Sequence, residues 1–317
     1  MKEKKNNNWI FLTNKDYIVE SKKIKKIYLK NINSSYLHRY IYEKTILKKV
    51  INIVKPDLIL SLQNIGINTK YNQVLYIHQA LPFQKNLINH VDSFMTFAKM
   101  KLMKRRLRTD INKAIRIIVQ TNYMKDLIGN YNKNIIVSLP AFKFTDVQQH
   151  IESENFIYPT NSQKYKGLDN IINFARLLKK KNNHALIKLT LSGNENKSIL
   201  KMAEIIKTEN LNISFIGRQS KDKMKDLYKN NNLLFTSKVE SLGLPLIEAA
   251  HYGCKIFAYD TKASREVLNN YENKVFFNDE NISEKYEEFL NMNNKNIGKN
   301  IFGESIVNIL QQQQLIN

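Results

Sequence analysis

The stretch from Asn232 to Tyr259, NLLFTSKVESLGLPLIEAAHYGCKIFAY, decides the fold. It begins with a short apolar run of the kind that a buried parallel strand shows, and a loop around Gly243 follows. The segment from Leu246 to Tyr252 predicts a helix that ends at Gly253, and a second apolar run follows it. Strand, loop, helix and strand in this order predict a layered α/β fold with a parallel sheet.

The loop and the first turn of this helix predict a ligand site. Unpaired backbone N–H groups and the positive end of the helix dipole lie there, just outside a strand's carboxyl end, and favour an anion such as a diphosphate. Glu240 precedes Gly243 and Glu248 falls about one turn into the helix, so two carboxylates bracket the loop. Carboxylates accept hydrogen bonds from hydroxyl groups and suit a polyol. The alternative is that Glu240 only supports the loop and that Glu248 is a surface residue paired with a lysine.

The run from Ser237 to Asp260 resembles the donor-site signature of the group 1 (family 4) retaining glycosyltransferases. Members of that family have the GT-B fold, an α/β fold in which two Rossmann-like domains with parallel sheets face each other across a cleft. The resemblance implies that Glu240 contacts the transferred sugar and that Glu248 contacts the nucleotide ribose. It also implies that the backbone of Gly243 and Leu244 holds the diphosphate.

A second segment, from Phe156 to Ile172, is similar to the start of the family's second domain, where a Lys-Gly pair opens the first helix. Lys166 is the matching lysine, which contacts phosphate in the family. Many members carry an arginine shortly after this strand, whereas Thr160 stands at the nearest position here and cannot replace a guanidinium group. Either Lys164 supplies the second positive charge, or the donor binds more weakly than is usual.

A third segment, from Leu211 to Arg218, predicts a strand that ends at Gly217, with a helix over 221–228 after it. In the family, the turn after this strand borders the nucleotide base. The resemblance therefore makes Gly217 and Arg218 candidates for the region of the base and the phosphates.

The first half of the chain resembles the family's first domain, which supplies the acceptor side of the cleft. Apolar runs over 56–61, 73–78 and 114–121 predict buried strands, and a helix is expected over 122–128. His78 ends the second run, where many members place a histidine close to the reacting sugar. The alternative is a loop histidine packed by Phe83.

The expected domains are 1–145 on the acceptor side, 146–300 for the nucleotide sugar, and a C-terminal helix over 301–317 that packs back on the first domain. The family's first strand normally runs into a Gly-rich loop, but no glycine precedes Gly66 here. The run from Trp9 to Thr13 looks more like a second strand than a first. We therefore expect a first domain that lacks its first strand and its Gly-rich loop.

The net charge of +22 on 317 residues is compatible with nucleic acid, an anionic membrane or acidic ligands. Residues 97–108 combine a basic face with Phe97, Met100, Met103 and Leu107 at helical spacing, which suits a helix at an anionic membrane surface. The alternative is that this apolar stripe packs on the first domain. Because aromatic residues are not interleaved with the basic cluster as stacking platforms, no nucleic-acid partner is expected.

The sequence shows neither a targeting segment nor a metal-ligand motif. No apolar run reaches the roughly 20 residues that span a bilayer, and the N-terminus lacks a signal peptide's apolar core. We expect a cytoplasmic protein, with a peripheral position on the inner face of the cell membrane left open. The single cysteine, Cys254, is expected to be a packing residue. No Cys/His cluster or Asp-x-Asp pair has metal-ligand spacing, so neither a metal nor any other cofactor is expected besides the donor substrate.

Residues and resemblance together predict a hexosyltransferase. The expected reaction is metal-independent, retaining transfer of a sugar from a nucleotide sugar, UDP-linked by the family's commonest pattern, to a saccharide or lipid-linked saccharide in cell-surface polysaccharide or glycoconjugate biosynthesis. The expected catalytic residues are Glu240, Lys166 and His78, and the expected donor-binding residues are Gly243, Leu244, Glu248, Thr160, Lys164, Gly217 and Arg218. The alternative is a catalytically impaired homologue that serves as a binding or scaffold subunit.

Overall fold

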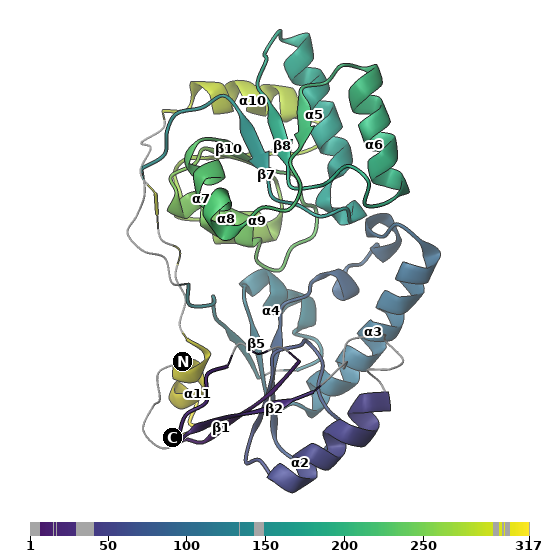
Figure 1. The fold of residues 1–317 in the computed structure, drawn as a ribbon, viewed down its shortest axis with the longest axis vertical. Coiled ribbons are helices and arrows are strands. Elements are labelled where there is room, and N and C mark those ends of the chain that lie inside the picture. The colour runs from purple at the N-terminus through teal and green to yellow at the C-terminus, as the bar shows by residue number, and fades with distance from the viewer. Residues whose placement is uncertain are drawn as a thin grey trace.

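The computed structural model of the protein describes residues 7–14, 16, 18–29, 41–132, 134–142, 149–293, 298–299, 301 and 305–316. These residues form two lobes, one above the other in Figure 1. The first lobe is defined here as the elements from β1 to β6 together with α11. The second lobe is defined as the elements from β7 to α10.

Within the described residues, the second lobe contains a six-stranded sheet in the order β12-β11-β10-β7-β8-β9, and each neighbouring pair runs parallel. The strands are β7 (Phe156–Tyr158), β8 (Ile187–Leu189), β9 (Ile213–Phe215), β10 (Asn232–Phe235), β11 (Ile256–Tyr259) and β12 (Lys274–Phe277). The chain adds β8 and β9 on one side of β7, and then β10 to β12 on the other. The strand order therefore reverses between β7 and β10, and in open α/β sheets ligands bind outside the carboxyl ends of the strands at such a point.

Helices cover this sheet and bury its strands on both faces. They are α5 (Leu168–Lys180), α6 (Lys197–Thr208), α7 (Lys221–Lys229), α8 (Leu244–His251), α9 (Lys262–Val267) and α10 (Ile282–Asn291). Each residue of β10 is buried, as the continuous apolar run predicts for a central parallel strand. Aromatic rings fill the core, where Phe174 meets Phe156 edge to face with ring centroids 5.2 Å apart.

The first lobe has a four-stranded parallel sheet in the order β3-β4-β5-β6 and a separate parallel pair of β1 and β2. The strands are β1 (Trp9–Thr13), β2 (Ile24–Tyr28), β3 (Ile59–Ser61), β4 (Gln73–Ile77), β5 (Arg116–Val119) and β6 (Ile135–Val137). The helices are η1 (Glu43–Leu47), α2 (Lys48–Val54), η2 (Leu81–Phe83), η3 (Leu87–His90), α3 (Phe94–Lys113) and α4 (Asn122–Ile128). The expected strands and the helix over 122–128 are thus present in this lobe.

The chain returns to the first lobe at its end. Helix α11 (Ile306–Gln312) lies beside that lobe in Figure 1, and its residues Ile309 and Leu310 pack against Val74 of β4 and Ile118 of β5. The expected domain boundary at residues 145 and 146 falls outside the described residues, so the division of the chain into domains stays a prediction.

The basic helix α3 is longer than the expected 97–108 and runs along one edge of the first lobe (Figure 1). Its apolar stripe faces inward: Met100 and Leu107 are buried, and Phe97 and Met103 pack against the same core. The stripe therefore stabilises the first lobe and is not free to contact a membrane. The neighbouring core of the first lobe decides this outcome, because it covers the apolar face of the helix.

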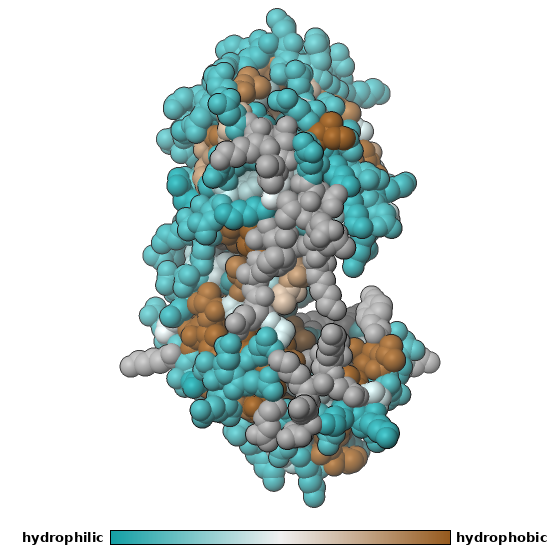
Figure 2. Space-filling model, turned by 90° about the vertical axis from the view of Figure 1, so that its left-hand side faces the viewer, coloured by the Kyte–Doolittle hydropathy of each residue, from teal (hydrophilic) through white to brown (hydrophobic). Residues whose placement is uncertain are grey.

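Polar side chains cover most of the described surface of the second lobe in the view of Figure 2, and apolar areas gather on the first lobe. No helix among the described residues is both long enough and apolar enough to cross a membrane.

Candidate functional site

The turn after β7 lies at the point where the strand order of the second lobe reverses. It contains the short helix η4 (Lys164–Lys166) and leads through Gly167 into α5. The hydroxyl groups of Tyr158 and Thr236 both donate to the carbonyl oxygen of Lys166, at 3.0 and 2.8 Å. The first bond ties the turn to the end of β7, and the second ties it to the residue after β10. Burial raises the pKa of the Tyr158 hydroxyl, which stays a donor.

Gly167 allows the turn to approach β10 closely. Its φ is +67°, and a Cβ atom at this position would lie 2.1 Å from the carbonyl oxygen of Thr236. Only glycine fits both the left-handed backbone and this gap. The Lys-Gly pair of the sequence therefore has a structural reason for its glycine as well as a candidate role for its lysine.

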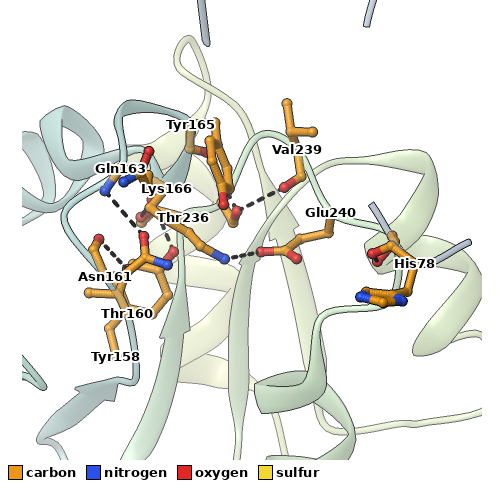
Figure 3. A network of polar contacts seen from close by, with 12 residues as sticks. His78, Tyr158, Thr160, Asn161, Gln163, Tyr165, Lys166, Thr236, Val239 and Glu240 are labelled. Carbon is orange, nitrogen blue, oxygen red and sulfur yellow. Dashed lines mark hydrogen bonds and ion pairs between the residues drawn. The ribbon is translucent and has the colours of Figure 1, made fainter. Parts of the chain in front are cut away.

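Lys166 and Glu240 form an ion pair in this structure, with Nζ 2.5 Å from Oε1 (Figure 3). The two residues follow β7 and β10, the strands on either side of the reversal in strand order. Their side chains are only 15% and 14% exposed, so each charge depends on the other for compensation. The structure thus brings together two of the three expected catalytic residues, and it does so by direct contact.

Helix α8 begins four residues after Glu240. Gly243 caps the helix with a φ of +73°, and Leu244 and Pro245 form its first turn. Leu244 is exposed, as expected for a residue that offers only its backbone N–H group. The helix starts two residues earlier than the sequence pattern predicts, because proline is well suited to the first turn.

Glu248 lies in the second turn of α8 and is paired with a tyrosine. Its Oε2 accepts a hydrogen bond of 2.7 Å from the hydroxyl of Tyr228 at the end of α7. Burial raises the pKa of Glu248, and the bond from Tyr228 opposes this shift. Glu248 is therefore not a surface carboxylate paired with a lysine, since its hydrogen-bond partner is a buried phenol.

Thr160 and Lys164 lie near the position where many family members carry an arginine. The backbone N–H of Thr160 donates to Thr190 Oγ1 at 2.9 Å, which ties the end of β7 to β8. Lys164 is exposed, and its backbone N–H donates to Asp92 of the first lobe at 3.3 Å. Lys164 thus stands at the boundary between the lobes.

Gly217 and Arg218 follow β9, which is separated from β7 by β8. Gly217 has a φ of +68° and donates its N–H to the carbonyl of Leu191 at 2.8 Å. Arg218 is exposed. These two residues border the same edge of the sheet as Lys166, but the structure does not bring them into the cluster around the Lys166–Glu240 pair.

His78 follows β4 of the first lobe and is held by Asn64 and Ser241. Asn64 makes two hydrogen bonds to it, one to the backbone and one to the ring. Ser241 Oγ donates to the carbonyl oxygen of His78 at 2.7 Å, which links His78 to the residue after Glu240. His78 is drawn with the Lys166–Glu240 pair in Figure 3. The alternative in which Phe83 packs this ring is not what the structure shows, because the ring neighbour is Tyr76, at 5.9 Å between centroids.

The loop between β10 and α8 also fastens the two lobes to each other. Val239 packs into the core of the first lobe, and Thr121 Oγ1 donates to the carbonyl of Ser241 at 2.9 Å. Farther along, the Glu266 carboxylate of α9 accepts from the backbone N–H groups of Asn122 and Tyr123 at 2.6 and 2.9 Å. Glu266 therefore caps the first turn of α4, in the other lobe.

Sequence analysis did not find Asn64, Tyr228, Ser241 or Glu266. Each acts on a residue more than ten positions away, and no local pattern signals such a pairing.

Cys254 was expected to be a packing residue, and it is fully buried. In the part of the chain that the structure describes, no three His, Cys, Asp or Glu side chains gather as a metal site would require.

Residues 143–301 match the family model described as Glycosyl transferases group 1. The capsular polysaccharide biosynthesis glycosyltransferase CapH of Staphylococcus aureus is 24% identical over 235 residues, which cover 68% of this chain and 66% of CapH. The chain thus spans about two thirds of that relative.

Solved structures share the fold. TarM of S. aureus has a TM-score of 0.61 at 20% identity, with 78% of this chain and 51% of TarM covered. WaaG, a glycosyltransferase involved in lipopolysaccharide biosynthesis, has a TM-score of 0.61 at 14% identity, with 89% and 82% covered. Both are GT-B glycosyltransferases, which confirms the expected α/β fold with parallel sheets. With a family model matched over half of its length and this fold, the chain belongs to the group 1 glycosyl transferases.

Proposed function

We propose that the protein transfers a sugar from a nucleotide sugar, UDP-linked, to a saccharide or lipid-linked saccharide acceptor. The observation that carries this proposal is the Lys166–Glu240 pair at the reversal in strand order, next to the first turn of α8. The family membership supports it, as do the UDP complexes of TarM and of the O-GlcNAc transferase GtfA. The name of CapH supports a role in polysaccharide biosynthesis.

In the proposed mechanism, the diphosphate lies against the N–H groups of Gly243 and Leu244, and Lys166 turns to it from Glu240. As the bond between sugar and phosphate breaks, negative charge grows on the leaving diphosphate. The ammonium group and the helix dipole stabilise that charge, and donors of this kind commonly contribute a few kcal/mol each, on the order of 3. Because these groups supply positive charge, the proposed reaction needs no metal ion.

The sugar itself is proposed to contact Glu240 and His78. Glu240, once released by Lys166, accepts hydrogen bonds from sugar hydroxyls, and its charge stabilises the developing oxocarbenium ion. His78 borders the reacting face from the first lobe. Retention of the anomeric configuration is proposed on the family resemblance alone. Glu248 is proposed to accept hydrogen bonds from the ribose with the oxygen that does not bond Tyr228.

The test is calorimetric titration of UDP, GDP and their sugar conjugates into the protein and its Lys166→Ala and Glu248→Ala variants. We expect one nucleotide to bind, and each substitution to weaken it about tenfold or more, about 1.4 kcal/mol. Lys201→Ala and Glu204→Ala on α6 are the matched controls, since both residues are exposed and far from the strand reversal. Absence of binding to any nucleotide by the folded protein would overturn the proposal in favour of a scaffold subunit, which the threonine at position 160 also favours.

We further propose that the acceptor side of the first lobe rests on an anionic membrane surface through the outer face of α3. Phe94, Met95 and Leu102 are 77%, 82% and 55% exposed on this helix. Lys99, Lys101 and Arg105 are exposed beside them. Apolar side chains next to cations are the composition that binds an anionic lipid surface.

Co-sedimentation with lipid vesicles tests this contact. The protein should bind vesicles that contain an anionic lipid and not vesicles of neutral lipid, and the Phe94→Ser/Met95→Ser variant should lose binding about tenfold. The control is Leu200→Ser/Leu290→Ser, which removes two exposed leucines of the second lobe. Equal binding by both double variants would refute the role of α3.

A further inference from the structure

Two hydrogen bonds join Asn64 to His78, and together they determine where the ring proton lies. The backbone N–H of His78 lies 2.7 Å from Asn64 Oδ1. A backbone N–H group can only donate, so the amide atom that faces it must be the oxygen. The orientation of the Asn64 side chain is therefore fixed by the backbone of its partner.

The amide nitrogen of Asn64 then faces the ring. Asn64 Nδ2 lies 3.2 Å from His78 Nε2, and an amide nitrogen can also only donate. Nε2 must consequently be the acceptor and carry the lone pair. In a neutral imidazole the proton then sits on Nδ1.

The charged form of the ring is disfavoured at this position. An imidazolium would place an N–H group on Nε2 against the N–H groups of the Asn64 amide. Desolvation by the surrounding protein acts in the same direction and lowers the pKa of His78. The neighbouring ring, Tyr76, accepts a hydrogen bond at its hydroxyl from Gln120 Nε2, and burial raises its pKa, so it carries no charge at neutral pH.

Asn64 itself is built into the fold. Asn64 is only 8% exposed, and its backbone is in the left-handed region with a φ of +68°. Asparagine tolerates this conformation better than most residues. The His78 residue, by contrast, is exposed, so a bound molecule can reach its ring.

We propose that Asn64 is a positioning residue that keeps His78 neutral with its proton on Nδ1, so that the ring offers an N–H donor to an oxygen of the bound sugar. His78 would then orient the sugar and would not act as a proton acceptor. This inference rests on the proposed function for the identity of the ligand, but the state of the ring follows from the two bonds alone.

The test is the isosteric substitution Asn64→Asp, followed by nitrogen NMR of the histidine rings. One carboxylate oxygen can still accept from the His78 backbone, while the other now faces Nε2 and favours a proton there. In the wild-type protein we expect the Nε2 signal of a nitrogen without a proton, assigned by its loss in His78→Gln. In Asn64→Asp we expect a protonated Nε2 and a raised His78 pKa.

Binding separates this inference from the proposed function. Asn64→Asp should weaken the nucleotide sugar about tenfold and leave UDP alone unchanged, because only the sugar meets His78. Asn212→Asp is the matched control, since the exposed Asn212 side chain donates to the carbonyl of another histidine, His184, at 2.6 Å. A wild-type ring protonated on Nε2 would overturn the inference whether or not Asn64→Asp folds. If no nucleotide binds but the Nδ1–H form is found, the proposed function fails and the positioning role stands.

Discussion

The ammonium nitrogen of Lys166 lies 2.5 Å from a carboxylate oxygen of Glu240. In the proposed reaction these two groups serve opposite ends of the donor, the diphosphate and the sugar. In this structure each of the two charges is compensated by the other. Binding of the donor must exchange this ion pair for two new sets of contacts, so Glu240 competes with the diphosphate for Lys166.

This competition predicts that substitutions of the two partners have different effects on nucleotide binding. Glu240→Gln frees Lys166, so UDP affinity should stay the same or rise by up to about threefold, while Lys166→Ala lowers it about tenfold. Sugar transfer should be lost in both variants. Calorimetry with UDP and a transfer assay with the nucleotide sugar measure the two properties. A loss of UDP affinity in Glu240→Gln equal to that in Lys166→Ala would contradict the competition.

Alanine substitutions at Gly167 and at Gly217 are expected to lower the stability of the protein by different amounts. Both have a left-handed backbone, but a Cβ at Gly167 would lie 2.1 Å from the Thr236 carbonyl oxygen, whereas at Gly217 the nearest atom is 3.8 Å away. Gly217→Ala should cost about 1 kcal/mol for the backbone conformation alone. Gly167→Ala should cost about 3 kcal/mol or more, because the backbone must also move. Thermal unfolding of the two variants checks this, and equal melting temperatures would show that the turn after β7 adapts freely.

We expect Glu248 to lower the stability of the folded protein near neutral pH while it strengthens the binding of UDP. The pKa of Glu248 is raised in the folded protein, which means that folding favours the protonated carboxyl. The contribution of this carboxyl to the free energy of unfolding is therefore fully present below the pKa of the unfolded chain, and it is lost as pH rises through the folded-state pKa. The Glu248→Gln side chain does not ionise, so the variant does not lose stability in this way, and its amide oxygen can still accept the hydrogen bond from the Tyr228 hydroxyl. The variant should therefore gain stability relative to the wild type between acid and neutral pH, and bind UDP about tenfold more weakly. Melting temperatures across this pH range test the first point. An advantage that shrinks toward neutral pH would contradict it.

The hydrogen bonds of Glu266 are expected to help hold the two lobes together. It accepts hydrogen bonds from the first turn of α4 in the other lobe, and its removal leaves those N–H groups without this cap. Glu266→Ala should cost about 1 kcal/mol and raise the radius of gyration of the ligand-free protein in small-angle X-ray scattering. Glu284→Ala is the control, because that side chain is 79% exposed on the second lobe. An unchanged radius of gyration would show that other contacts suffice to hold the lobes.

Local patterns predicted most elements, because a strand buried on both faces and a helix with one apolar face differ in spacing. The strands at 73–77, 116–119 and 232–235 and the helix at 122–128 all follow from such patterns. The apolar stripe of α3 has the same spacing whether it packs on protein or on lipid. Only the position of the neighbouring core decides between the two, and no pattern within α3 contains it.

The candidate site shows the same limit. The motif around Glu240 and Lys166 identified both residues, but their direct contact joins positions 74 apart in the chain. Asn64 lies in an ordinary loop segment, and its importance follows only from the approach of His78. Glu266 belongs to a helix whose sequence indicates nothing about the other lobe. Such pairings depend on how two lobes meet, which is a property of the whole chain.

Under the proposed function, the position of Ser241 would link the binding of the two substrates thermodynamically. This residue bonds His78 and Thr121 of the first lobe, while its neighbour Val239 packs into that lobe's core and Glu240 faces the proposed donor. The loop cannot shift toward a nucleotide without altering these contacts. Any ligand of the first lobe that tightens them must change the affinity for the donor, and the donor must change the affinity for that ligand by the same factor. Donor and acceptor would then bind cooperatively, with Ser241 as the point of coupling.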